Sequence, residues 1–290
     1  EGKELAEMYE LRESGAQAFS DGLKPIQSAG MMVKALQYVK RFNGVIIQVP
    51  DDQTMAAHGL MNEGIVSTRM GLPGKPVIAE ELMVSRDIAL AGYTGSRLHI
   101  TGISSPRAVD AVYKAKQEGI NVSCSVTPYH LFFCDEDLVT YDSYLKVNPP
   151  LRTRTDMLAL RQALRDGKID CIASHHLPQE YDSKILEFEY AKNGMITLEC
   201  LYGAILEAVP DLSPEHTVEL LQANPAKIFG LDTNSIREGA SADLTLFQPG
   251  NKYRFEMSMI KSISKNSPFI GKELTGKVVG IITKKSMRLN

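Results

Sequence analysis

The distribution of apolar and polar residues predicts helices that alternate with short buried strands. Short runs of β-branched and other apolar residues are typical of strands buried on both faces of a parallel sheet. Five such runs precede residue 230, at 16–20, 45–49, 97–101, 120–126 and 169–173. Apolar residues at helical spacing predict helices at 3–14, 28–43, 76–92, 105–119, 154–167, 195–209 and 214–221, the last of them broken at Asn224-Pro225. This alternation predicts an α/β fold.

The pattern changes after Gly239, where alternating apolar and polar residues replace the helical spacing. Ala242 to Phe247, Lys277 to Thr283 and Met287 to Leu289 are typical of strands. We therefore expect two parts, a βα-barrel portion at 1–232 and a β-rich side sheet at 233–290.

The chain has too few predicted strands to form a closed barrel by itself. Five strand–helix units are predicted before residue 230, whereas a closed (β/α)8 barrel has eight. The chain also opens on Glu1-Gly2-Lys3-Glu4, without an initiator methionine. We expect that the chain begins inside a longer protein and that the first barrel strands are missing from it.

Composition and charge exclude several classes of partner. The 290 residues carry a formal net charge of -3, so no basic surface for nucleic acid is indicated. No apolar run approaches the roughly 20 residues that span a bilayer. The four cysteines show no CxxC spacing, which favours buried or free thiols in a cytoplasmic protein. Neither Cys124 nor Cys171 has a convincing catalytic base nearby in the sequence.

Several motifs together resemble the bacterial class I dihydroorotase family of amidohydrolases. The main ones are Val126-Thr127-Pro128-Tyr129-His130-Leu131, Lys146-Val147-Asn148-Pro149-Pro150-Leu151-Arg152 and Asp170-Cys171-Ile172-Ala173-Ser174-His175-His176. Supporting segments lie at 61–64, 80–87, 224–231, 238–244 and 266–269, in the order that the family has them. The resemblance implies an amidohydrolase (β/α)8 barrel with a small β-sandwich built from both chain ends.

The resemblance also implies a zinc centre, which in the family hydrolyses or closes a cyclic amide. Zinc lowers the pKa of its bound water to near 7 and polarises the carbonyl. The family's His-x-His on the first barrel strand has no counterpart in this sequence. Its other ligand positions correspond here to Asp21, Gln48, Gly102 and His175. Gln48 and Gly102 stand where the family has histidine, and His175 stands where it has the aspartate that is both ligand and general acid/base.

Three of these four positions have therefore changed, which argues against the binuclear site and predicts no zinc cofactor. Asn148 still matches a substrate-binding position of the family. A rebuilt mononuclear site from His175, His176, His130 and Asp21 is an alternative, although adjacent residues of a strand point to opposite faces. His99 and His130 are otherwise expected to be hydrogen-bonded structural histidines. His58 and His216 are expected on helix surfaces.

The first hypothesis is a non-catalytic dihydroorotase-like protein of pyrimidine biosynthesis, a structural partner of aspartate carbamoyltransferase. The second is an active zinc-dependent dihydroorotase that interconverts N-carbamoyl-aspartate and dihydroorotate. The third is a barrel that binds an anionic pyrimidine through Asn148 and Arg152, with Lys146 and Arg152 either holding the anion or lying solvated in loops. A homo-oligomer, such as a dimer, is expected because a partial barrel leaves strand edges unpaired.

Overall fold

The central element is a five-stranded parallel sheet in the order β1-β2-β5-β6-β7. The computed structural model describes residues 3–233, 236–283 and 286–289. The strands are β1 Ala18–Phe19, β2 Val45–Gln48, β5 Arg97–Ile100, β6 Val122–Val126 and β7 Cys171–Ile172. All five predicted strands are therefore confirmed, with shorter bounds. In the described part of the chain β1 and β7 pair with one neighbour each, so the sheet is an open arc of barrel strands.

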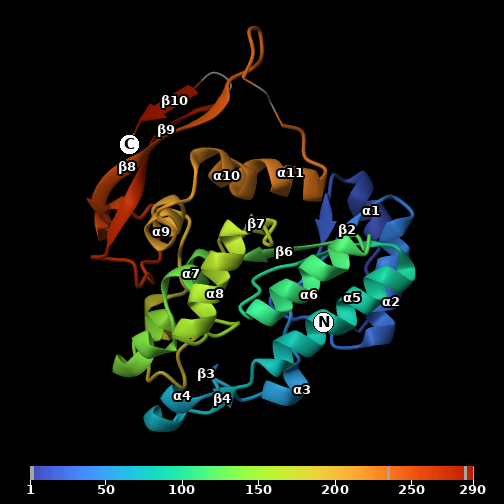
Figure 1. The fold of residues 1–290 in the computed structure, drawn as a ribbon, viewed down its shortest axis with the longest axis horizontal. Helices are drawn as coiled ribbons and strands as arrows, with labels where there is room; N and C mark the ends of the chain where they lie inside the picture. The colour runs from blue at the N-terminus through green and yellow to red at the C-terminus, as the bar shows by residue number, and fades with distance from the viewer. Residues whose placement is uncertain (1–2, 234–235, 284–285, 290) are drawn as a thin grey trace.

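Four helices lie side by side along the sheet, in the order α2, α5, α6 and α8 (Figure 1). Their bounds are α2 Ala29–Lys40, α5 Ile78–Thr94, α6 Pro106–Gln117 and α8 Arg154–Arg165, and α1 Met8–Glu13 packs on α2. The side chains of Ser28, Ser105 and Thr153 cap three of them by accepting backbone N–H groups. None of the described helices is long and apolar enough to cross a membrane.

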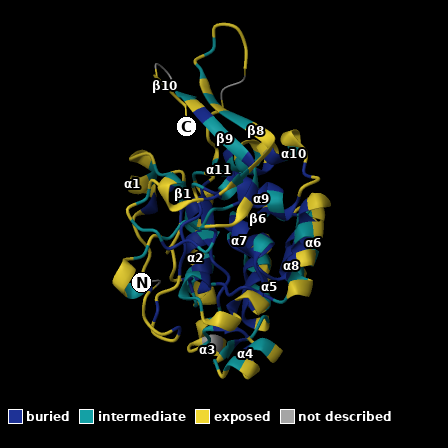
Figure 2. Cartoon of the chain, turned by 90° about the vertical axis from the view of Figure 1, so that its left-hand side faces the viewer, coloured by how far each residue is buried: buried dark blue, intermediate teal, exposed yellow. Residues whose placement is uncertain are grey.

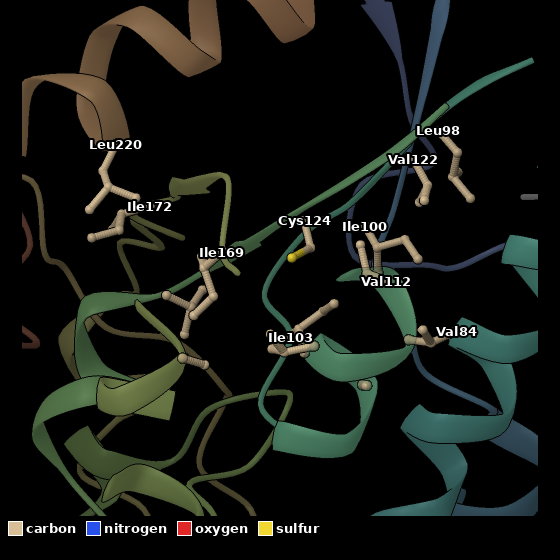
Figure 3. Packing of buried hydrophobic residues seen from close by; sticks show 14 of the residues in the cluster. Val84, Leu98, Ile100, Ile103, Val112, Val122, Cys124, Ile169, Ile172 and Leu220 are labelled. Carbon is tan, nitrogen blue, oxygen red and sulfur yellow. The ribbon is translucent and has the colours of Figure 1, made fainter. Parts of the chain in front are cut away.

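The core lies between the sheet and these helices. Ile100 and Val122 of neighbouring strands face Val84 of α5 and Val112 of α6 (Figure 3). Ile100, Val84 and Val112 have no exposed surface. Burial of each such side chain contributes roughly 1.5–3 kcal/mol, so this layer holds the strand ends in fixed positions.

Short elements cover the carboxyl ends of the strands, which we call the mouth. They are α3 Gln53–Ala56, β3 Met61–Asn62, α4 Ile65–Met70, β4 Gly74–Lys75, α7 Pro128–Phe132 and the single helical turns η1 Asp135–Thr140, η2 Ser143–Leu145 and η3 Tyr181–Ser183. A second apolar cluster lies beneath them and includes Met61, Tyr129 and Phe269. The rings of Phe133 and Phe269 pack there with centroids 4.9 Å apart.

The opposite, basal end of the sheet is covered by one helical run (Figure 1). It consists of α10 Pro214–Val218, a π-turn at Glu219–Ala223 and α11 Asn224–Phe229. The predicted break at Asn224-Pro225 is wrong. Pro225 lies in the first turn of α11, where a missing N–H costs little, and the π-turn accommodates it.

Three predicted helix ends are also wrong. Helix α1 begins at Met8 rather than at residue 3. Helix α5 runs past Gly92 to a left-handed cap at Gly95, because Gly92 serves packing: a Cβ there would lie 3.2 Å from Ile120 Cδ1. Helix α9 begins at Leu201 and ends at Ala208. Residues 195–200 precede it without helix and end in a turn at 198–200, because Met195 forms a parallel bridge with His176 and Ile196 N donates to Asn266 O.

The C-terminal tail forms an antiparallel three-stranded sheet in the order β10-β9-β8, as predicted. Its strands are β8 Asp243–Arg254, β9 Glu273–Thr283 and β10 Ser286–Leu289, with a single turn η5 at Met257–Met259. The outer end of this sheet projects beyond the body and is largely exposed (Figure 2). The expected boundary between 232 and 233 adjoins residues 234–235, which lie outside the described residues, so it stays a prediction.

Close backbone contact attaches this sheet to the barrel portion. A Cβ on Gly203 of α9 would lie 2.5 Å from the Tyr253 hydroxyl oxygen. A Cβ on Gly276 of β9, whose φ is +91°, would lie 2.5 Å from Leu206 Cδ1. A side chain at either glycine would have to displace these groups, so glycine favours the close packing of the tail on α9.

Candidate functional site

A hollow of about 700 Å³ opens at the mouth between the ends of β1 and β7. We call it the mouth hollow. Its lining is more apolar than polar, with Val49, Tyr129 and Val147 among the apolar residues. Its polar lining comprises Ser20, Thr101, Asn148, His175, His176, Gln179, Lys192 and Asn193. Two of the five predicted site positions, Asn148 and His175, therefore meet at one hollow.

Gln48, at the end of β2, is 1% exposed and has both ends of its amide occupied. Its Nε2 donates to Ile26 O at 3.2 Å, and its Oε1 accepts Ile26 N at 3.3 Å. The side chain thus pairs with the backbone as a strand neighbour would. Gln48 is therefore a structural residue here, buried and held by the Ile26 backbone.

Gly102 and His175 form one packing unit. Gly102 has φ +73°, and a Cβ at this residue would lie 2.3 Å from Cε1 of His175. The imidazole of His175 therefore fills the space in which a side chain at position 102 would stand. His175 Nε2 lies 2.8 Å from Thr101 Oγ1, which fixes the ring in that place.

The alternative mononuclear site is not assembled. Asp21 is exposed in the turn after β1 and lines a different hollow, beside α1 and α2. His130 is buried, with Nδ1 2.8 Å from Thr127 Oγ1 and Nε2 3.1 Å from Pro149 O. Across residues 3–233, 236–283 and 286–289, no three His, Cys, Asp or Glu side chains are grouped as metal ligands. The donors present do not fit a zinc centre, which needs several converging lone pairs.

The alternation of side chains along a strand predicted that the adjacent histidines point to opposite faces. This prediction is wrong. Strand β7 ends at Ile172, and His175 has a left-handed φ of +43°, so both imidazoles line the mouth hollow. His176 Nδ1 accepts the backbone N–H groups of Thr197 at 3.1 Å and Leu198 at 3.2 Å. His176 therefore carries its proton on Nε2.

Asn148 is held by a buried ion pair beside the mouth hollow. Lys75 Nζ donates to Asn148 Oδ1 at 2.7 Å and lies 2.6 Å from Asp51 Oδ1, while Asn148 Nδ2 donates to Asp51 Oδ2 at 3.0 Å. These three residues also line a smaller polar hollow of about 380 Å³. Asn148 keeps one amide hydrogen and one lone pair for a ligand.

Arg152 is neither an anion ligand nor a solvated loop charge. It is 3% exposed, its Nη2 lies 3.1 Å from Glu80 Oε2, and its Nε donates to Ser104 Oγ at 2.9 Å. Glu80 Oε1 in turn accepts the backbone N–H groups of Ser104 at 2.8 Å and Ser105 at 2.7 Å. This saturated network joins three motifs of the sequence, and it excludes Arg152 from the mouth hollow.

Lys146 is buried as well, and it organises the wall of the mouth hollow. Its Nζ donates to the carbonyl oxygens of Phe188 at 2.7 Å, Glu189 at 2.9 Å and Ala191 at 2.7 Å. Lys184 acts alongside it, donating to Lys192 O at 2.8 Å. Burial and the neighbouring Lys146 charge lower the pKa of Lys184 to about 8. The two ammonium groups thus bind the loop at 184–194 from within.

Replacing Lys146 with methionine is expected to loosen this loop while the barrel stays folded. Three carbonyls lose their donor, and each buried unsatisfied group costs about 1–3 kcal/mol. Limited proteolysis should cut residues 184–194 at least ~10-fold faster, since local opening sets the cleavage rate. The control is Lys192→Met at an exposed side chain. Equal cleavage rates in the two variants would contradict the role of Lys146.

Several buried titratable groups make the fold acid-sensitive. Burial lowers the pKa of His99 and of His130 to about 3 and that of half-buried His175 to about 4. Burial raises the pKa of Asp87 to about 6, against the effect of Arg86. Near pH 5 the unfolded chain therefore binds two or three more protons on these histidines, and the folded chain binds one more on Asp87.

The net difference is one to two protons in favour of the unfolded chain, so stability falls as the pH falls. Between pH 6 and pH 4 the free energy of unfolding should drop by about 1–3 kcal/mol per pH unit. Urea unfolding at pH 6, 5 and 4 measures this slope. In His130→Gln, which keeps an N–H donor but no titrating ring, the slope should fall by about 1.4 kcal/mol per pH unit. A stability that is level or rises toward pH 5 would contradict the assignment.

The two histidines expected on helix surfaces and the four cysteines lie away from the mouth hollow. His58 is exposed, in the turn after α3 rather than on a helix surface, and His216 is partly buried on α10. All four cysteines are free and buried, and burial raises the pKa of Cys171 to about 12. Sequence reasoning missed Thr101 and Ser125, which contact the histidines of the sheet. The sequence does contain a signal for these residues. Polar side chains stand two residues apart, and so on the same face, in two otherwise apolar strands: His99 and Thr101 in one, Ser123 and Ser125 in the next.

Comparison of the structure with known ones defines the class of fold. The L-hydantoinase (dihydropyrimidinase) from Arthrobacter aurescens superposes with a TM-score of 0.84 at 25% sequence identity, over 97% of this chain and 66% of that one. A D-hydantoinase superposes with a TM-score of 0.80 at 18% identity, which bears on fold alone. The parallel sheet and its helices thus have the amidohydrolase barrel architecture, with an antiparallel C-terminal sheet.

Sequence comparison then defines the family. A family model described as Dihydro-orotase-like matches residues 1–108. A dihydroorotase of Syntrophus aciditrophicus is 42% identical over 281 residues, covering 96% of this chain and 66% of the relative. A dihydroorotase of Geobacter sp. (strain M21) is 39% identical over 285 residues, covering 98% and 67%. The chain belongs to the dihydroorotase family, and it spans about two thirds of the length of these relatives.

Proposed function

We propose that this chain is a non-catalytic dihydroorotase-like protein of pyrimidine biosynthesis. The observation that carries the proposal is the state of the family's ligand positions. The buried Gln48 amide pairs with the Ile26 backbone, and the space at Gly102 is filled by the ring of His175. Asp21 is exposed and lines another hollow. The side chains at the family's ligand positions are thus either engaged in packing or apart from the mouth hollow.

The retained barrel is proposed to act as a structural partner of aspartate carbamoyltransferase, in the cytoplasm and as a homo-oligomer. Membership of the dihydroorotase family supports the pathway, because the relatives carry that name. The division into a barrel portion at 1–232 and a β-rich portion at 233–290 belongs to the same proposal.

The alternative is an active dihydroorotase with an altered site. Two observations favour it: the size of the mouth hollow, and the presence of Asn148, His175 and His176 on its wall. In that case residues outside this chain would have to supply the ligands that the described residues lack.

Two measurements on the purified protein separate these functions. The first is turnover of dihydroorotate and N-carbamoyl-aspartate with added zinc, with an active dihydroorotase as positive control. We expect no turnover above the blank. The second is light scattering after gel filtration with the aspartate carbamoyltransferase of the same organism, where we expect one complex, with or without a chelator. Turnover would establish the enzyme, and separate elution of the two proteins would refute the partnership.

A further inference from the structure

Five polar side chains follow one another through the interior of the sheet, and we call them the interior chain. From the mouth to the basal end they are His175, Thr101, Ser125, His99 and Ser123. Thr101 Oγ1 lies 2.8 Å from His175 Nε2 and 3.0 Å from Ser125 Oγ. Ser125 Oγ lies 3.1 Å from His99 Nε2, and His99 Nδ1 lies 2.9 Å from Ser123 Oγ. Every link is within hydrogen-bond distance.

The two ends of the interior chain reach different hollows. His175 and Thr101 line the mouth hollow. Ser123 lines a second hollow of about 350 Å³ at the basal end of the strands, together with Arg97 and the Lys116–Asp170 ion pair. Between the ends, Ser125 has no exposed surface and His99 is 2% exposed. The interior chain is therefore a sealed polar connection between two solvent-facing hollows.

Counting hydrogens restricts this connection to two arrangements. Each hydroxyl has one hydrogen to donate, and a neutral imidazole has one N–H and one acceptor nitrogen. Among the described residues, Ser125 Oγ and Thr101 Oγ1 have no hydrogen-bonding neighbours besides those named above. If both imidazoles carried the proton on Nε2, one hydroxyl hydrogen between them would have no acceptor. If both carried it on Nδ1, the two hydroxyl hydrogens would have to serve three links, and one link would have no hydrogen.

The two imidazoles must therefore hold opposite tautomers. In one arrangement His99 Nε2–H donates to Ser125, Ser125 to Thr101 and Thr101 to His175 Nε2, which leaves Nδ1–H of His175 as a donor. In the other arrangement every bond is reversed, and His175 Nδ1 becomes an acceptor. A buried unmade hydrogen bond costs about 1–3 kcal/mol, so mixed arrangements are strongly disfavoured.

We propose that the interior chain is a two-state coupling device between the hollows. A ligand group at His175 Nδ1 selects one arrangement, and the selection sets which nitrogen of His99 is protonated at the basal end. The mouth hollow can then take either a hydrogen-bond donor or an acceptor at this point, at the cost of reversing the chain. This coupling depends on the hydroxyls and needs no metal.

The test is the tautomer of each histidine, measured by long-range ¹H–¹⁵N NMR near neutral pH. In the unaltered protein we expect opposite tautomers at His99 and His175. Ser123→Ala removes the acceptor of His99 Nδ1–H and should drive His99 to Nε2–H, because an orphaned buried N–H is rarer than an under-satisfied acceptor. His175 should then move to Nδ1–H across the whole interior chain.

Thr101→Val cuts the chain while keeping the side-chain shape, and Ser125→Ala is the second cut should the first variant fold poorly. In either background, Ser123→Ala should no longer change His175. The matched control is Ser96→Ala, a buried serine before β5 that donates to Leu36 O and lies outside the chain. Equal tautomers of His99 and His175 in the unaltered protein would overturn the proposal. So would a response of His175 to Ser123→Ala that survives both cuts.

Discussion

Replacing Gly102 with alanine is expected to lower the free energy of unfolding by about 2–5 kcal/mol, as urea unfolding would measure. Overpacking against a fixed neighbour costs about 1–3 kcal/mol, and a left-handed backbone costs a residue with a Cβ about 1–2 kcal/mol more. Both apply here, because the new Cβ would lie 2.3 Å from His175 Cε1 at φ +73°. The same reasoning predicts that histidine at position 102 cannot restore a ligand while His175 keeps its place.

The steric part of the destabilisation by Gly102→Ala should disappear when the ring of His175 is removed. In the double variant Gly102→Ala, His175→Ala, the two effects should fall short of additivity by about 1–3 kcal/mol. The matched control is Gly167→Ala, at φ +67° with nothing within 4 Å of the added Cβ. This control should lower the free energy of unfolding only by the cost of the left-handed backbone, about 1–2 kcal/mol. If Gly102→Ala costs no more than Gly167→Ala, the ring of His175 does not fill this space.

The second large effect is expected from Glu80→Gln, which leaves the Arg152 guanidinium buried beside a neutral amide. Breaking one partner of a buried ion pair costs about 3–5 kcal/mol. Both side chains are almost fully buried, at 2% exposure for Glu80 and 3% for Arg152, and Glu80 also accepts two backbone N–H groups. Unfolding by urea at pH 7 should show the loss.

Glu81→Gln is the matched control, one residue along the same helix. Glu81 is partly exposed and, within the described part of the chain, accepts a hydrogen bond only from the Ser105 hydroxyl, so its replacement should cost about 1 kcal/mol or less. Replacing both Glu80 and Arg152 with apolar residues should cost less than the sum of the single changes, since no lone charge remains. Equal costs for Glu80→Gln and Glu81→Gln would contradict the buried network.

The elements of the fold could be predicted where local signals and burial agree. All five parallel strands form, and Ser28, Ser105 and Thr153 cap helices because their side chains satisfy free N–H groups. The failures have a common cause. Gly92 was taken as a helix stop, but it permits close packing on Ile120, a contact made by distant chain. Met195 pairs with His176 rather than beginning a helix, again through a tertiary contact.

The sequence predicts which residue types stand at the candidate site, but not how their side chains are arranged in space. The motifs indicate which positions lack ligands, because residue identity is read directly from the chain. They do not indicate that His175 would occupy the space at Gly102, or that its left-handed backbone would direct it to the same hollow as His176. Nor do the motifs distinguish a buried, structural Arg152 from an Arg152 that binds a ligand, because an arginine at this position is compatible with either role.

We propose that the family's metal positions are engaged in packing or lie apart from one another, and that they hold no zinc. The most direct measurement is elemental analysis of the purified protein after zinc loading and removal of free metal. We expect far less than one zinc per chain, with the unfolding midpoint unchanged by zinc or chelator. Near-stoichiometric zinc that raises the unfolding midpoint would contradict the claim and direct attention to His175 and His176 as its ligands.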